Sequence, residues 1–395
     1  MTGFLDNWRR LRVVLVHDWL TGLRGGERVL ELLCAGFPQA PIYTLVHDPG
    51  TVGDTIGRRD IRTSWLDRVP GARRHYRMFL PLFPAAAASM RLPPCDLVIS
   101  LSHCAAKSAR APAGARHLCY CFTPMRYAWL FGDEYFGRNP LKRAALAPLL
   151  AWLRRWDRRT AARVTEFATL SLHVRQRIRD FYGRDARVVY PPVNTGFWTP
   201  APDRAAAPAA HDLVVSALVP YKRIDLAIAA YNRLGAPLRI AGDGPELRRL
   251  RAMAGPNVSF LGRLNDEALR AEYRACRALV FPGQEDFGLV PVEAQACGKP
   301  VIAFGRGGAA ETVRHGETGI LFAEQTVESL ADAAKSAWAA QWNPAACRAN
   351  AERFGIERFV TGFAECIQAC MAERSTTPGR AGHTTTRDAA PARPA

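Results

Sequence analysis

Short apolar runs of strand length alternate with helical patterns along most of this chain, and that alternation is the strongest constraint on its fold. Several runs are apolar throughout, as expected for parallel strands that are covered on both faces. The runs of the first half are Leu11–Val16, Pro41–Val46, Asp96–Leu101, His117–Phe122, Glu166–Leu170 and Arg187–Tyr190. Those of the second half are Leu213–Leu218, Leu238–Ala241, Val258–Leu261, Ala278–Phe281 and Val301–Phe304. The sequence therefore predicts an α/β protein with two doubly wound parallel sheets.

The chain is expected to form two domains, because 395 residues are too many for one ordinary core. A proline- and alanine-rich linker at Pro200–Ala210 separates the halves. We therefore predict a first domain over residues 1–195 and a second over residues 196–355. A further helix within residues 356–374 should follow, and residues 375–395 should be disordered because they contain no large apolar side chain.

The composition indicates a cytoplasmic protein rather than an exported or membrane-spanning one. No apolar run has the length of a membrane-spanning helix, and no signal-peptide core follows the first charged residues. The ten cysteines show no metal-ligand spacing. We therefore expect them to be reduced thiols in a protein core.

The formal net charge of +17 allows nucleic acid, an anionic membrane or a phosphate-rich substrate as a partner. The segment Leu141–Val164 interleaves arginines with leucines and tryptophans, as a helix does that lies on an anionic bilayer. The same pattern also suits a helix that packs its apolar stripe into the core and leaves its arginines in solvent. Nucleic-acid binding is disfavoured, since charge alone supports it.

Two glutamates, Glu285 and Glu293, stand with seven residues between them where a buried strand should meet a helix. A corner of this kind directs backbone N–H groups and a positive dipole end at an anion. The uncharged loop Phe287-Gly288-Leu289 lets the backbone approach a ligand closely. A carboxylate beside it can accept hydrogen bonds from the vicinal hydroxyls of a sugar or a ribose, although either glutamate alone could be a solvated helix-end charge.

Three further features follow predicted strands and therefore belong to the same edges of the two sheets. Gly25 and Gly26 open the first helix and could cradle a phosphate, but they do not form the Gly-x-Gly-x-x-Gly pattern of dinucleotide sites. Lys222 would supply a point charge for a diphosphate. His103 ends a strand, and Lys107 would add a cation one helical turn away.

The two glutamates resemble the Glu-x7-Glu signature of the family 4 retaining glycosyltransferases. Further segments resemble that family's C-terminal domain: Val219–Ile228, Ala241–Glu246, Phe260–Gly262 and His315–Leu321. His17–Arg28 and Cys121–Tyr127 resemble the N-terminal half, particularly of its mannosyltransferases. The resemblance implies the GT-B fold, in which two Rossmann-like domains face each other and the C-terminal helix crosses back to the first domain.

The resemblance also implies roles for individual residues. Glu285 would contact the sugar hydroxyls and Glu293 the ribose diol. Lys222 would hold the donor phosphates, and His103 would lie near the donor sugar, so that His103, Lys222 and Glu285 form the catalytic set. The other donor-binding residues would be Gly25, Gly26, Arg223, Gly242, Arg263, Phe287, Gly288, Leu289 and Glu293. The residues on the acceptor side would be Trp19, Lys107, Arg126 and Tyr127.

The implied reaction is the transfer of a hexose from a nucleotide sugar, with retention, onto a saccharide. GDP-mannose is the expected donor and a polyprenyl-linked saccharide of surface polysaccharide or glycolipid assembly the expected acceptor, with a UDP- or ADP-sugar donor as the alternative. The sequence contains no Asp-x-Asp motif, so neither a metal nor another cofactor is expected. The enzyme would work at the inner face of the cytoplasmic membrane.

The sequence departs from the family pattern at Ala217, where the family carries a phosphate-binding arginine. Loss of one such charge could remove about 2–4 kcal/mol of leaving-group stabilisation. A different class of function therefore stays open, namely a nucleotide-sugar-binding protein with weak or lost turnover.

Overall fold

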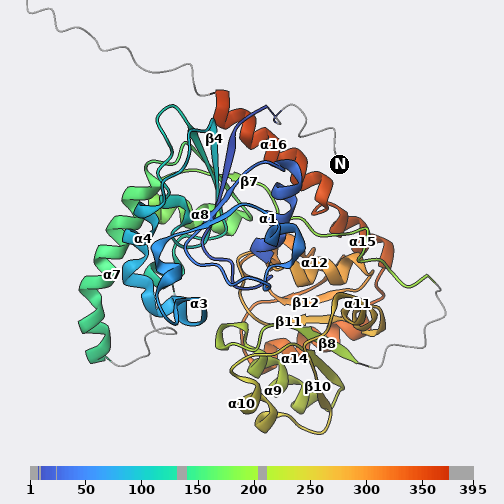
Figure 1. The fold of residues 1–395 in the computed structure, drawn as a ribbon. Helices are drawn as coiled ribbons and strands as arrows, with labels where there is room; N and C mark the ends of the chain where they lie inside the picture. The colour runs from blue at the N-terminus through green and yellow to red at the C-terminus, as the bar shows by residue number, and fades with distance from the viewer. Residues whose placement is uncertain (1–7, 9, 24, 131–139, 203–210, 373–395) are drawn as a thin grey trace, which may run out of the picture.

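The computed structural model describes residues 8, 10–23, 25–130, 140–202 and 211–372, and Figure 1 shows two α/β domains that meet along one side. The expected disordered tail, residues 375–395, lies outside the described residues. None of the helices in the described ranges combines the length and the apolar character needed to cross a membrane.

The first domain is built on a seven-stranded sheet in the order β3-β2-β1-β4-β5-β6-β7, with every neighbouring pair parallel. Its strands are β1 (Val13–His17), β2 (Ile42–Thr44), β3 (Ile61–Thr63), β4 (Leu97–Ser102), β5 (Arg116–Cys121), β6 (Glu166–Thr169) and β7 (Arg187–Val188). Alternate residues of β1 enter different cores, since Val13 and Leu15 pack on one face of the sheet and Val14 and Val16 on the other. Burial on both faces explains the uninterrupted apolar runs.

The helices of this domain follow its strands in the expected alternation. They are α1 (Gly25–Gly36), α2 (Gly53–Gly57), α3 (Ala72–His75), α4 (Phe83–Ser89), α5 (Arg126–Trp129), α7 (Pro140–Ala161) and α8 (Leu172–Tyr182), with 3-10 turns η2 (Trp65–Arg68), η3 (Tyr76–Leu82) and η4 (Ala106–Ser108). The bounds of α8 have local causes. The Ser171 hydroxyl accepts a hydrogen bond from the Val174 amide at its start, and Gly183 ends it in the left-handed conformation.

The second domain holds a six-stranded parallel sheet in the order β10-β9-β8-β11-β12-β13. Its strands are β8 (Asp212–Val215), β9 (Leu238–Ala241), β10 (Val258–Gly262), β11 (Leu279–Phe281), β12 (Val301–Phe304) and β13 (Gly319–Phe322). Its helices are η5 (Pro220–Lys222), α9 (Ile224–Leu234), α10 (Leu247–Met253), α11 (Asp266–Ala275), α12 (Leu289–Ala296), α13 (Ala309–Thr312), α14 (Val327–Ala339) and α15 (Pro344–Glu352).

The last helix, α16 (Ile356–Ala372), leaves the second domain and runs along the first, which confirms the predicted crossing (Figure 1). The Tyr120 ring on β5 packs against Phe359 and Phe363 of α16 at centroid distances of 5.8 and 6.0 Å. The crossing begins beside Val193, which bridges to Gly355.

The structure contains two strands that the sequence analysis missed. β3 is an exposed edge strand of three residues, too short and too polar to give an apolar run. β13 follows a tight turn closed by a hydrogen bond from the Gly316 amide to the Gly319 carbonyl. Three of its four residues, Gly319–Leu321, were recognised only as part of a family motif, because a short run beside a glycine-rich turn carries little strand signal.

Candidate active site between the domains

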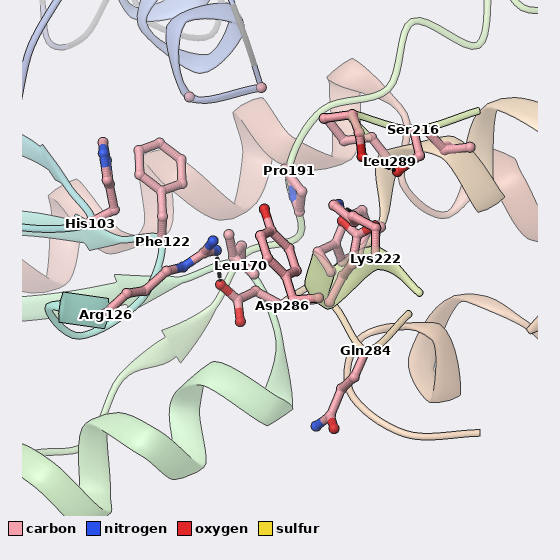
Figure 2. A pocket seen from close by; sticks show the side chains of 18 of the residues that line it. His103, Phe122, Arg126, Leu170, Pro191, Ser216, Lys222, Gln284, Asp286 and Leu289 are labelled. Carbon is pink, nitrogen blue, oxygen red and sulfur yellow. Dashed lines mark hydrogen bonds and ion pairs between the residues drawn. The ribbon is translucent and has the colours of Figure 1, made fainter. Parts of the chain in front are cut away.

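A cavity of about 770 Å³ lies between the two domains, at the carboxyl ends of strands from both sheets (Figure 2). The first domain lines it with the ends of β1 and β4 and the starts of α1 and α5, and the second with the ends of β8 and β11. The predicted site residues that line it are Trp19, Gly25, Gly26, His103, Arg126, Tyr127, Lys222, Arg223, Glu285, Phe287, Gly288 and Leu289.

The two glycines at the start of α1 allow close packing, Gly25 against the second domain and Gly26 within the first. A Cβ atom on Gly25 would lie 3.1 Å from Leu289 of the second domain. A Cβ on Gly26 would lie 3.3 Å from the Phe122 ring. Both distances are tighter than ordinary van der Waals contact, so a side chain at either position would push neighbouring groups apart.

The loop between β11 and α12 is held rigidly by a second pair of glycines. The Gly308 amide donates a hydrogen bond of 2.8 Å to the Glu285 carbonyl. Cβ atoms on Gly307 and Gly308 would meet the carbonyl oxygens of Glu285 and Phe287 at 2.4 and 2.3 Å. Gly288 begins α12 with a φ of 89°, a conformation that favours glycine. These contacts fix the backbone position from which the Glu285 side chain projects.

Lys222 and Glu285, two residues predicted from separate motifs, form an ion pair in the cavity. Their side chains are 15% and 21% exposed, so the pair lies largely out of solvent. Arg223 follows in the left-handed conformation with a φ of 55°, lines the cavity and pairs with Asp225 at 3.3 Å. The second domain thus presents two adjacent cations beside one carboxylate.

Asp286, which the sequence analysis overlooked, joins the domains through two arginines of the first domain. Its carboxylate pairs with Arg126 of α5 and Arg177 of α8 (Figure 2 shows the Arg126 pair). Its backbone carbonyl accepts a 2.6 Å hydrogen bond from the Ser171 hydroxyl. Burial acts to raise the pKa of Asp286, but the two arginine charges outweigh it and lower that pKa. The sequence signal for Asp286 was its charge, because the loop residues that follow it are uncharged.

Glu311 of α13 makes a second link across the interface. Its carboxylate accepts hydrogen bonds from the backbone amides of Leu172 and His173, at 2.8 and 3.0 Å, in the first turn of α8. Tyr190 donates its hydroxyl to the same carboxylate at 3.2 Å. Glu311, which begins one helix of the second domain, therefore caps a helix of the first domain.

Asp18, also overlooked, fixes the position of His103. The buried Asp18 carboxylate accepts hydrogen bonds of 2.5 to 2.9 Å from four successive backbone amides, those of residues 103–106. It also lies 3.1 Å from His103 Nδ1. The His103 ring packs edge-on against Trp19, with centroids 4.4 Å apart. The ring is therefore oriented by groups behind it and lies at the cavity wall.

Lys107 does not line the cavity, contrary to the expectation of an acceptor-side cation. Its side chain is 1% exposed, and its ammonium pairs with Asp157 of α7 and donates to the Cys104 carbonyl at 3.0 Å. Burial acts to lower the pKa of Lys107, but the Asp157 carboxylate outweighs it and raises that pKa. The helical spacing from His103 was misleading, because the chain there forms the short turn η4 that faces α7.

Gly242 and Arg263 also lie outside the cavity lining. Gly242 has a φ of 139°, and a Cβ there would lie 1.8 Å from the Ser216 carbonyl oxygen. A glycine is therefore required at position 242 because the ends of neighbouring strands pack closely there. Arg263 is exposed beyond the end of β10.

Glu293 lies one helical turn beyond the lining residues Leu289 and Val290 of α12. The Tyr273 hydroxyl donates a 2.8 Å hydrogen bond to its carboxylate. Burial raises the pKa of Glu293 to about 7, although the Tyr273 hydrogen bond acts in the opposite direction. This carboxyl group therefore changes charge near neutral pH.

The charge of the lining suits an anionic ligand. Five cationic side chains border the cavity, namely Arg77, Arg126, Arg177, Lys222 and Arg223, against the carboxylates of Glu27, Glu285 and Asp286. Within the described ranges, His, Cys, Asp and Glu side chains form no group of three that could hold a metal ion. Cations beside a hydroxyl-accepting carboxylate fit a phosphorylated, polyhydroxylated molecule.

Several known proteins resemble this chain in sequence. The sequence model of the family described as Glycosyl transferases group 1 matches residues 212–354. A D-inositol 3-phosphate glycosyltransferase from Geodermatophilus obscurus is 33% identical over 234 residues, which are 51% of this chain and 52% of that protein. A GDP-mannose-dependent alpha-(1-6)-phosphatidylinositol monomannoside mannosyltransferase from Mycobacterium tuberculosis is 32% identical over 192 residues, 42% of this chain and 50% of that protein. The chain thus spans about half the length of these curated relatives.

Solved structures share the fold at low sequence identity. HepE from Anabaena, in complex with UDP, has a TM-score of 0.67 at 18% identity and covers 91% of this chain and 100% of its own. Sucrose-phosphate synthase from Thermosynechococcus elongatus has a TM-score of 0.68 at 20% identity and covers 92% and 100%. With the two parallel sheets, these similarities confirm the predicted GT-B fold.

We expect Glu293→Gln to change how stability depends on pH. The pKa of Glu293 is raised from 4.5 to about 7 in the folded protein, so between these values the unfolded chain releases a proton that the folded chain keeps. The Glu293 contribution therefore makes stability fall as the pH rises through that range. At pH 8 the variant should be more stable than wild type by about 3 kcal/mol, and at pH 4 the two should match.

Urea unfolding at the two pH values measures this difference. Glu324→Gln, at an exposed glutamate of the same domain, is the matched control and should leave the pH dependence unchanged. A Glu293→Gln variant that is no more stable than wild type at pH 8 would contradict the burial of a proton-retaining carboxyl group.

Proposed function

We propose that this chain, whose residues 212–354 form a glycosyl transferases group 1 domain, is a retaining glycosyltransferase that moves a hexose from a nucleotide sugar onto a saccharide. The observation that carries the proposal is the Lys222–Glu285 pair, held between two Rossmann-like domains at the strand ends where such folds bind ligands. The cation matches a diphosphate and the carboxylate matches sugar hydroxyls.

In the proposed reaction, the bond from the sugar anomeric carbon to the phosphate oxygen breaks and a bond to an acceptor oxygen forms. The leaving phosphate takes the acceptor proton on the same face of the sugar, which gives retention. Lys222, Arg223 and the loop amides before α12 neutralise the diphosphate. Bound diphosphate competes with Glu285 for Lys222, and the freed carboxylate then accepts hydrogen bonds from the sugar.

The proposed donor is GDP-mannose, which the printed name of the Mycobacterium tuberculosis relative supports. HepE, in complex with UDP, supports a UDP-sugar as the alternative. Glu293 is the proposed ribose ligand, and its buried carboxyl group would then make nucleotide affinity depend on pH near neutrality. The proposed acceptor is a lipid-linked saccharide of surface polysaccharide or glycolipid assembly.

The first prediction from this proposal concerns donor binding. In the presence of EDTA, GDP-mannose and GDP should raise the melting temperature more than other nucleotide sugars and their diphosphates do. Lys222→Ala should weaken binding by about tenfold to a hundredfold, because it removes a charge-assisted contact with phosphate. Calorimetric titration measures the affinity, and Lys335→Ala, at an exposed lysine of α14, is the control.

If the protein binds UDP-sugars more tightly than GDP-mannose, the proposed donor is a UDP-sugar instead of GDP-mannose. Binding that requires a divalent metal would contradict the proposed metal-independent site. No response to any nucleotide would contradict the proposed function itself.

The alternative function is nucleotide-sugar binding with weak or lost turnover, and Ala217 favours it. Ala217 is exposed and lines the cavity near Lys222, so an arginine side chain has room to enter. If the missing arginine limits turnover, Ala217→Arg should raise kcat by about a hundredfold, as expected for one added oxyanion-stabilising group. Steady-state rates with GDP-mannose measure it. An unchanged or reduced kcat, with substantial wild-type turnover, would exclude this alternative.

We further propose that α7 contacts an anionic membrane. Its second half packs into the core through Leu153 and Asp157, as the structural interpretation predicted. Most of the side chains over residues 144–152 are exposed or half-buried, and Leu141 and Trp152 are 79% and 48% exposed. Figure 1 shows α7 along the outer edge of the first domain, on the side away from α16. Exposed arginines beside an exposed tryptophan suit an interfacial helix.

Replacing Arg155 and Arg159 by glutamine should weaken binding to vesicles of phosphatidylglycerol and phosphatidylcholine by about tenfold. These side chains are exposed, and their spacing puts them on the helix face of Trp152. Co-sedimentation measures the binding. Arg248 and Arg251 in α10 of the second domain provide the control pair for the same double replacement. Equal binding of the α7 variant and wild type would contradict the membrane contact.

A further inference from the structure

His17, at the carboxyl end of β1, is a buried polar side chain of the cavity wall that the sequence analysis did not assign. It is 1% exposed, and its strand lies between β2 and β4, where it pairs in register with Thr44 and Leu101. An ideal Cβ on Gly26 would lie 3.5 Å from His17 Nε2. The ring therefore borders the cavity beside the glycine loop that opens α1.

The hydrogen bond at one ring nitrogen defines the chemistry of the other. His17 Nδ1 lies 2.9 Å from the Trp19 carbonyl oxygen. A carbonyl oxygen only accepts, so Nδ1 carries the hydrogen. In the neutral ring, Nε2 then presents a lone pair and acts as an acceptor.

His17 Nε2 has no hydrogen-bond partner within the described part of the chain, although it is shielded from solvent. Buried polar atoms are normally paired, and an unpaired one is costly. In the neutral ring this nitrogen has no hydrogen to donate to a phosphate oxygen. A hydroxyl group can satisfy the nitrogen, because a hydroxyl donates a hydrogen.

We infer that His17 Nε2 accepts a hydrogen bond from a sugar hydroxyl and thereby selects the saccharide that enters the cavity. This inference rests on the proposed glycosyl transfer. The hydroxyl belongs to the transferred hexose or to the acceptor, and both present the same chemistry to the nitrogen. The His103 ring lies 6.3 Å away between centroids, so the bound hydroxyl lies near both histidines.

Two substitutions separate this role from a structural one. Asparagine at position 17 places an amide nitrogen where Nδ1 donates to Trp19, but it removes the acceptor at the Nε2 position. Glutamine places a carbonyl oxygen near the position of Nε2 and gives up the Trp19 bond. We expect His17→Asn to lower kcat/KM by about tenfold to a hundredfold, and His17→Gln to recover most of that loss.

The opposite order, with His17→Asn close to wild type and His17→Gln impaired, would assign His17 a structural role and overturn the inference. His75→Asn, at an exposed histidine of α3, is the matched control. Melting temperatures of all variants show whether a loss of rate reflects unfolding. The binding of donor alone, measured by calorimetry, gives a readout that does not depend on turnover.

Monodeoxy analogues identify which hydroxyl is bound. With wild type, the analogue that lacks this hydroxyl should react about tenfold more slowly than the parent sugar. With His17→Asn, the analogue and the parent sugar should react at the same rate. Coupling with a deoxy-donor assigns the transferred hexose, and coupling with a deoxy-acceptor assigns the acceptor. If no analogue couples to position 17, no sugar hydroxyl bonds to Nε2 and the inference is wrong.

The same experiments separate this inference from the proposed function. If wild type transfers sugar and His17→Asn has the same kcat/KM, the proposed function stands and only the role of His17 is overturned. A wild-type protein that neither binds nor transfers any sugar overturns both.

Discussion

The ionic contact of Asp286 with two arginines is the constraint on which the geometry of this site depends. Arg126 and Arg177 belong to the first domain, and Asp286 follows Glu285 directly in the second. The contact therefore fixes the interdomain distance at the residue next to the proposed sugar ligand. Buried ion pairs stabilise a fold weakly but are costly to break on one side only. The cavity is thus defined by a contact that tolerates few alternative arrangements.

The same lining also keeps its charges paired when no ligand is bound. Glu285 balances Lys222, and Asp286 balances two arginines. An entering anion must exchange partners rather than simply neutralise unpaired charge. Such exchange lowers the affinity for small anions that bring no hydroxyls, because Glu285 would lose its cation and gain no donor in return. The pairing therefore favours ligands that supply phosphate and hydroxyl groups together.

Much of the architecture was predictable from the sequence, because uninterrupted apolar runs mark buried parallel strands and glycines mark the ends of helices. Site residues were predictable where each lies in a continuous motif of its own, as Glu285 and Lys222 do. Asp18, Asp286 and Glu311 were not recognised, since each acts on segments 85 or more residues away. No local spacing encodes such contacts.

The error at Lys107 has a different origin. Spacing of four residues predicts one helix face, but only where a helix forms, and this segment is a short turn against α7. Conversely, His17 was visible in the sequence, yet nothing in its neighbourhood distinguishes a satisfied core histidine from one with an unpaired nitrogen. That distinction depends on the Trp19 carbonyl, which only the folded backbone positions.

The return of α16 to the first domain has a consequence for the way this protein is made. Phe359 and Phe363 complete a core around Tyr120, yet they are synthesised after the entire second domain. On the ribosome, that apolar surface of the first domain stays uncovered while about 150 further residues are added, which takes roughly ten to thirty seconds at about 5–20 residues per second. Helix α16 thus completes a domain whose sheet is synthesised before the second domain, and the nascent chain carries an exposed apolar surface until α16 docks.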